Sequence, residues 1–217
     1  MSFTYKDAFL AWYGHDSFYL KLGDHTIWVD PYELPADVPR SELVLITHDH
    51  GDHYSMPDIE KVAGGETIVV APFSLVAQGL VTQRLPVQES MVLGRLQITA
   101  TAAYNVDKFR GPGQPFHPEG EERCGYLIHW QGLSIYHAGD TDRIAEMKSL
   151  NPDIALLPVS GTYVMTAEEA AGALEDLKPE VAIPMHYGSI VGDEKDAQYL
   201  KEHAPSGVRV EILPREG

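Results

Sequence analysis

Short apolar runs separated by turn-forming residues recur along the whole chain. Residues 17–22 and 26–31 are rich in aromatic and β-branched side chains and are bounded by Gly, Asp and Pro, which is typical of strands. Residues 42–48 read ELVLITH, with a short continuous apolar run before Thr47 and His48, which suits a strand buried on both faces. Further strands are predicted at residues 9–14, 66–72, 90–94, 96–103, 125–130, 133–139, 153–159, 180–187 and 208–213.

Helical patterns are fewer and lie mostly in the second half. Residues 166–177 predict a helix with Thr166 as its N-cap and Glu169 three residues later, the spacing of a capping box. Other helices are predicted at residues 56–64, 73–80, 142–150 and 194–203. The strand-rich half ends near residue 103, and a loop rich in Gly and Pro spans residues 104–123. Two sheets packed on each other with helices outside would account for this order, which predicts an α+β fold.

Composition narrows the class of protein. A length of 217 residues with 44% hydrophobic residues predicts one globular domain over residues 1–217. The net charge of −16 and the scattered basic residues disfavour nucleic acid. No apolar run approaches the roughly 20 residues that span a bilayer, so no membrane partner is expected. The lone Cys124 and a start without a signal-peptide pattern favour the cytoplasm, and one cysteine cannot form a thiolate metal cage.

A dense cluster of metal-binding residue types follows the strand predicted at residues 42–48. The segment THDHGDH, residues 47–53, contains three histidines and two aspartates. His48 and His50 are two residues apart, so an extended backbone points both side chains the same way. Gly51 permits a sharp turn, after which Asp52 and His53 can reach a second, adjacent subsite. Imidazole and carboxylate ligands suit Zn, Mn or Fe.

Two later strand ends offer further ligands. Asp140 follows the predicted strand in YHAGDT, where Gly139 allows a close approach, and His186 ends the strand in IPMHYG. Open sheets place their sites at such strand ends. Asp140 could bridge two metals through its two carboxylate oxygens.

Together these three motifs resemble those of the metallo-β-lactamase superfamily. The segment WYGHDSFYLKLGDHTIWVDP resembles the opening hairpin of that superfamily, and the overall look is closest to the branch with the ascorbate-phosphate lactonase and related cytoplasmic hydrolases. The resemblance implies a four-layer αββα sandwich, with two packed mixed sheets and outer helices. It leaves the substrate open, because the superfamily includes lactonases, thioesterases, nucleases, phosphodiesterases and oxidoreductases.

The resemblance also implies roles for individual residues. His48 and His50 would bind one of two divalent metal ions, with Zn preferred over Mn or Fe. Asp52, His53 and His186 would bind the other, and Asp140 would bridge them. Asp30 would support the metal-binding loop from behind. The chemistry of a metal centre makes Asp52 and His15 the candidate catalytic residues. Asp52 could accept a proton, and the leaving group could take its proton from metal-bound water or from a nearby acid, either His15 at the mouth of the site or Tyr187.

One position departs from the family pattern. A histidine is expected between the first cluster and the bridging aspartate, and this chain has Asn105 there, with His117 twelve residues later in the loop. Three interpretations remain open: His117 is the ligand, Asn105 coordinates weakly or positions water, or the subsite lacks a protein ligand. Thr162, just beyond a predicted strand, and Tyr187, at the end of another, are expected near the substrate.

The sequence thus predicts a metal-dependent hydrolase that uses a metal-bound hydroxide on a small ester, lactone or phosphoester. Two alternatives remain, a di-iron redox protein of the same fold and a metal-binding scaffold without turnover. A small-molecule substrate is the expected partner, and the oligomeric state is open.

Overall fold

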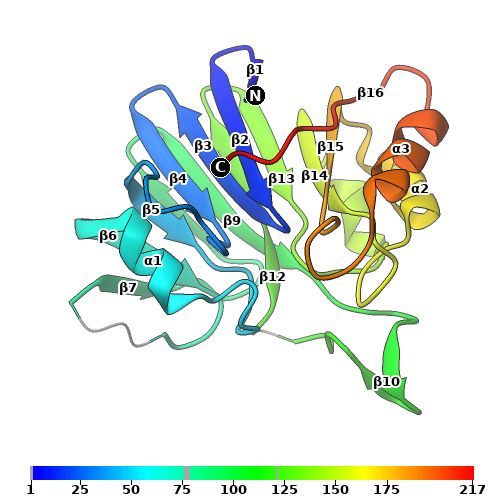
Figure 1. The fold of residues 1–217 in the computed structure, drawn as a ribbon, viewed down its shortest axis with the longest axis horizontal. Coiled ribbons are helices and arrows are strands. Elements are labelled where there is room, and N and C mark those ends of the chain that lie inside the picture. Colours follow the sequence, from blue (N-terminus) through cyan, green and yellow to red (C-terminus); the bar gives the residue numbers. More distant parts are fainter. Residues whose placement is uncertain (1, 76–78, 121) are drawn as a thin grey trace.

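Two seven-stranded sheets pack face to face in the computed structural model, which describes residues 2–75, 79–120 and 122–217 (Figure 1). The first sheet contains, in spatial order, β1 (Phe3–Tyr5), β2 (Ala8–Gly14), β3 (Ser17–Leu22), β4 (His25–Val29), β5 (Ser41–Leu45), β6 (Ala63–Ala71) and β7 (Val81–Arg84). The second has the order β16-β15-β14-β13-β12-β9-β8, with β8 (Ser90–Leu93), β9 (Leu96–Ala102), β12 (Cys124–Trp130), β13 (Leu133–His137), β14 (Ile154–Pro158), β15 (Val181–Met185) and β16 (Arg209–Val210).

Both sheets are mixed and are built in the same way. The strands β1 to β4 are antiparallel, and β4 to β7 are parallel. In the second sheet β8, β9, β12 and β13 are antiparallel, and β13 to β16 are parallel. Each half therefore has strands whose carboxyl ends lie at the same edge of its sheet, which is where a site can assemble.

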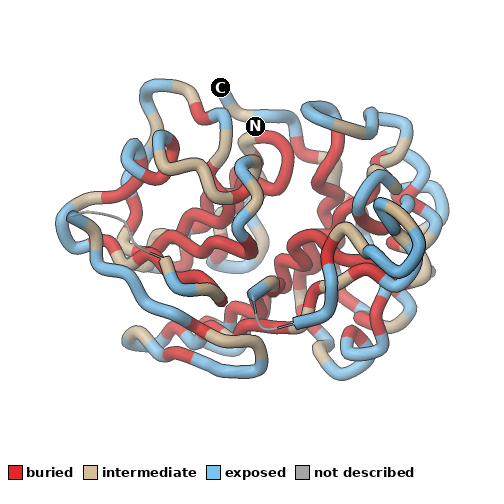
Figure 2. Tube along the Cα trace, turned by 90° about the horizontal axis from the view of Figure 1, so that it is seen from below, coloured by how far each residue is buried: buried red, intermediate tan, exposed pale blue. Residues whose placement is uncertain are grey.

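Helices cover the outer faces of the sandwich. The helix α1 (Met56–Val62) lies outside the first sheet, and η1 (Ala145–Ser149), α2 (Ala167–Leu177) and α3 (Glu194–His203) lie outside the second (Figure 1). The main apolar core fills the space between the sheets, and a smaller one lies between the first sheet and α1. Buried segments run through the middle of the molecule, with exposed loops around them (Figure 2). The predicted αββα sandwich is confirmed, as is the capping box of α2 at Thr166 and Glu169.

Four local predictions were wrong. Residues 142–150 form only the short 3-10 helix η1, and the strand predicted at 208–213 is reduced to β16. The helix α1 ends at Val62, where β6 begins at once, and does not run to Gly64. The loop at 104–123 contains a small hairpin of β10 (Phe109–Gly111) and β11 (Gln114–Pro115), which projects from the body (Figure 1). Strands β1 and β7 were not predicted.

The helix predicted at residues 73–80 includes residues 76–78, which lie outside the described residues. Within the part of the chain that the structure describes, no helix combines the length and apolar character needed to cross a membrane.

Candidate metal centre

Strand ends from both sheets meet at one end of the sandwich. The loop after β5 carries the histidine cluster, Asp140 lies just beyond β13, and His186 directly follows β15. Gly139 makes the close approach possible: it has a φ of +62°, and a Cβ there would lie 2.7 Å from the carbonyl oxygen of Cys124. Any larger residue would push the two strand ends apart. Asp140 directly follows Gly139 in the chain, so this close approach fixes its carboxylate at the centre.

Three imidazoles converge on one side of Asp140, and we call them the imidazole group (His48, His50 and His117). Nε2 of His48 lies 3.0 Å from Nδ1 of His50, which lies 3.4 Å from Nε2 of His117. Nε2 of His117 lies 3.2 Å from Oδ2 of Asp140. Burial lowers the pKa of His48 well below its ordinary value and the pKa of His117 to about 4. The rings are therefore neutral at pH 7 and can offer lone pairs to a cation.

On the other side lies the mixed group (His15, Asp16, His53 and His186), whose ligand atoms lie within 4.8 Å of one another. Nε2 of His53 and Nε2 of His186 each lie 3.4 Å from Oδ1 of Asp140. Burial works to raise the pKa of Asp140, but His186 and His53 outweigh it and hold that pKa well below its ordinary value. Asp140 is thus an ionised carboxylate with one oxygen toward each group.

Buried polar atoms without partners mark this centre. Nε2 of His53, Oδ1 of Asp140 and both carboxylate oxygens of Asp16 are buried and make no hydrogen bond within the described residues. Such atoms are costly to bury unless something else compensates for the lost water. A cation among them would satisfy all of these atoms at once, so the donor set fits a metal.

Neighbouring oxygens fix the orientation of His53 and His48. Both Nδ1 of His53, at 2.8 Å, and the hydroxyl of Thr47, at 2.6 Å, donate to Oδ2 of Asp30. The Thr47 hydroxyl oxygen in turn accepts from Nδ1 of His48 at 3.1 Å. Asp30 therefore lies behind the loop and orients it, and Nε2 of each ring faces the centre.

The other two rings are held in the same way. Nδ1 of His186 donates to the hydroxyl of Ser160 at 2.9 Å, because that hydroxyl donates to a backbone carbonyl. Nδ1 of His117 donates to Oδ1 of Asn105 at 3.0 Å. With Nδ1 occupied, Nε2 of both rings also faces the centre. Such partners raise the basicity of a ligating histidine and fix its tautomer.

Asn105 lies outside the ligand groups and clamps the loop that carries His117. Its Oδ1 also accepts from the His117 backbone N–H at 2.7 Å, and its Nδ2 donates to Oδ1 of Asp142 and to the carbonyl of Tyr163. Among the three interpretations of this subsite, the geometry brings His117 into the group and uses the Asn105 amide elsewhere. The role of His117 as a ligand stays a prediction.

His15 is buried, contrary to the expectation that it lies at the mouth of the site. Its Nε2 lies 3.2 Å from Oδ2 of Asp52, and burial lowers the pKa of His15 to about 4, so the neutral ring donates to the carboxylate. Burial raises the pKa of Asp52, but the contacts with His15 and His53 outweigh it and hold that pKa below its ordinary value. Asp52 is thus an ionised, partly exposed group positioned by His15.

A cavity of about 310 Å³ opens onto the centre. Its lining consists of His50, Asp52, Arg110, Phe116, His117, Asp140 and Tyr163. Thr162 and Tyr187 are not part of it, contrary to expectation. Thr162 is exposed, and Tyr187 stacks on Trp12 at 4.9 Å beside a different cavity.

Sequence reasoning missed Asp16, which is buried in the turn between β2 and β3. The signal available was its place beside His15 after a Gly at a strand end.

The backbone around the centre is strained, because His15, Asp30 and His186 have φ of +48°, +45° and +57°. Non-glycine residues rarely adopt this conformation, and it persists where the surroundings enforce it. The His186 N–H donates to the His15 carbonyl at 3.1 Å, which couples two of these positions.

The fold and the converging donors define a protein with a buried histidine and aspartate metal centre on an αββα sandwich. A family model for a β-lactamase superfamily domain matches residues 9–186. The chain belongs to the metallo-β-lactamase superfamily.

Relatives of similar length support its place among the metal-dependent hydrolases. A UPF0173 metal-dependent hydrolase of Methanopyrus kandleri is 31% identical over 94% of this chain and 95% of its own. Another, from Thermococcus onnurineus, is 33% identical over 92% of this chain and 93% of its own. The crystal structure of a candidate metal-dependent hydrolase from Parabacteroides distasonis is 31% identical, covers 98% of both chains and has a TM-score of 0.82.

Proposed function

We propose that the chain hydrolyses a small ester, lactone or phosphoester with two divalent metal ions, of which Zn is preferred over Mn or Fe. The observation that carries the proposal is the convergence of four imidazole Nε2 atoms, from His48, His53, His117 and His186, around Asp140. When bound there, the two cations would lower the pKa of a shared water towards about 7 and polarise the reacting oxygen of the substrate.

The residues divide this work between them. The imidazole group would hold one metal, His53 and His186 would hold the other, and Asp140 would bridge them. Asp52 lies between the centre and the cavity, with Oδ2 bound by His15. Its Oδ1 is left to bind the second metal or to accept the proton of the attacking water. His15 therefore acts as a positioning residue for Asp52.

The cavity favours a small substrate. Its volume of about 310 Å³ lies at the lower end of the range for small-molecule sites. Phe116 and Tyr163 provide aromatic walls with ring centroids 4.7 Å apart, and Arg110 lies over the Phe116 ring. This lining suits an apolar body with an anionic substituent, as in a small carboxylated lactone or a phosphoester. We place the reaction in the cytoplasm, on the basis of the single cysteine.

Metal analysis followed by a substrate screen tests this proposal. Protein purified without added metal is expected to contain Zn, to lose activity on lactones, esters or phosphoesters after chelation, and to regain it with Zn or Mn. Asp52→Asn should lower kcat by roughly 10²–10⁴-fold, the usual contribution of a general base. His129→Ala, an exposed histidine of β12, is the matched control and should leave kcat unchanged.

Two other outcomes would replace the proposal. Two tightly bound Zn ions with no hydrolysis across the screen would indicate a metal-binding scaffold without turnover. Two bound irons with redox activity would instead indicate the di-iron alternative.

A further inference from the structure

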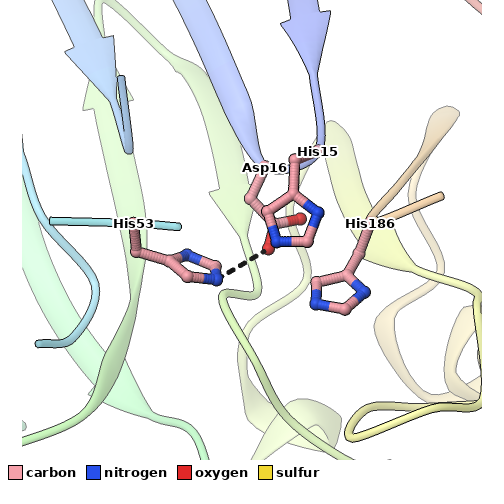
Figure 3. A group of neighbouring side chains, drawn as sticks. All are labelled: His15, Asp16, His53 and His186. Atoms are coloured by element: carbon pink, nitrogen blue, oxygen red, sulfur yellow. Dashed lines mark ion pairs between the residues drawn. The ribbon is translucent and has the colours of Figure 1, made fainter. Parts of the chain in front are cut away.

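The carboxyl group of Asp16 is fully enclosed and has no role in the turn that carries it. The residue is 1% exposed, and neither oxygen makes a hydrogen bond within the described residues. An aspartate that stabilises a turn normally bonds a nearby backbone N–H. The Asp16 side chain instead points away from its own backbone neighbours, toward His53 (Figure 3).

The backbone of Asp16 is held firmly in this position. Its carbonyl accepts from Nε2 of His137 at 2.9 Å. The Gly139 N–H donates to Nδ1 of the same ring, which fixes the tautomer with its proton on Nε2. The turn between β2 and β3 is thus tied to the end of β13, three residues before Asp140. The direction of the Asp16 side chain follows from this anchor.

The atoms that face Asp16 are imidazole nitrogens. Oδ2 of Asp16 lies 3.6 Å from Nε2 of His53, which is too long for a hydrogen bond (Figure 3). Nδ1 of His53 bonds Asp30, and Nδ1 of His186 bonds Ser160, so Nε2 is the nitrogen that each ring turns toward the centre. Two unpartnered carboxyl oxygens and these imidazole nitrogens thus share one enclosed space, with ligand atoms within 4.8 Å of one another, and a cation among them would satisfy them all.

We propose that Asp16 is a ligand of the second metal, which it would hold together with His53, His186 and Oδ1 of Asp140. Asp52 then faces the cavity, bound to His15, and its free oxygen is available to the reacting water. This inference rests on the proposed function, because it assigns a further ligand within the same centre. It also makes the mixed group richer in oxygen than the imidazole group.

Metal titration of Asp16→Asn tests the assignment without any substrate. Apoprotein is titrated with Zn²⁺ against a chromophoric chelator, and the thermal midpoint is measured with and without Zn²⁺. We expect the Kd of one Zn²⁺ to be unchanged and that of the other to rise roughly 10–100-fold or more. The midpoint of the apoprotein should not fall, because the variant removes a buried carboxyl group whose oxygens have no hydrogen-bond partner among the described residues. Asp24→Asn, in the exposed turn between β3 and β4, is the matched control.

The alternatives are separable. An unchanged Kd for both Zn²⁺ ions overturns the inference, and so does weaker binding accompanied by a lower apoprotein midpoint, since a structural residue would lower both. If Asp16→Asn does not fold, Asp16→Ser is measured in the same way. Wild-type protein that binds Zn²⁺ at neither group overturns the proposed function and this inference together. Wild-type protein that binds two, with Asp16→Asn indistinguishable from it, overturns this inference alone.

Discussion

The imidazole group and the mixed group lie on either side of Asp140, but they are built differently. In the imidazole group, burial keeps the rings neutral, and one of them, His117, comes from a long loop. In the mixed group, His53 comes from the loop after β5, His186 directly follows β15, and every member is buried. The imidazole group therefore depends on the position of the loop at residues 104–123. The mixed group depends instead on a strand end and on turns with strained backbone.

Removing the carboxylate of Asp140, which the two groups share, should abolish metal binding at both of them. Asp140→Ala is expected to abolish tight binding of both metals, because Asp140 offers one oxygen to each group. Metal content per chain after dialysis against a chelator measures this, and it should fall from about two to near zero. Asp153→Ala, which removes a structural carboxylate that bonds Ser134, should keep its metals. Full retention of one metal in Asp140→Ala would show that Asp140 is not a bridge.

Breaking the loop clamp should affect the imidazole group alone. Asn105→Ala removes the acceptor of the His117 Nδ1 and the donors to Asp142 and Tyr163. Loss of such a supporting partner typically costs 10–100-fold in metal affinity, and we expect a loss of about that size for one of the two ions. Competition titration with a chelator measures it. Equal weakening of both ions would contradict the distinction, and Gln114→Ala, exposed in β11, serves as the control.

The smallest effect should come from the hydroxyl behind His186. Ser160→Ala removes the acceptor for Nδ1 of His186, but the ring stays packed against His15 with centroids 4.2 Å apart. We expect the metal at the mixed group to bind about tenfold more weakly, which is the low end for the loss of a supporting partner. The same titration measures it, with exposed Ser149→Ala as the control. Weaker binding at the imidazole group instead would reverse the assignment of the two ions.

Much of the fold was predictable because burial leaves a direct pattern in the sequence. The apolar run at residues 42–48 and the capping box at Thr166 are local signals, and both correspond to observed elements. The helix predicted at residues 142–150 failed for a tertiary reason. The Asp142 carboxylate accepts the N–H groups of Val106 and Asp107, and its own N–H donates to the Tyr104 carbonyl. The residues of a first helical turn are therefore engaged by a distant loop, which no local pattern reveals.

The candidate centre was predictable to a similar degree. His48, His53, Asp140 and His186 come together because each follows a strand and those strand ends lie at one end of the sandwich. The position of His117 was not predictable, since it depends on a clamp between residues twelve apart within a loop. Asp16 was missed for a related reason: only the tertiary anchor through His137 turns it inward.

His117 belongs to a long loop, so metal binding at the imidazole group depends on where that loop lies. The same loop supplies Arg110 and Phe116 to the cavity wall, so a bound substrate and a bound metal would both stabilise one arrangement of it. By thermodynamic linkage, whichever ligand binds first raises the affinity for the other by the same factor. The imidazole group would then bind its metal most tightly when a substrate is present. Release of product would weaken the binding of that metal and loosen the loop.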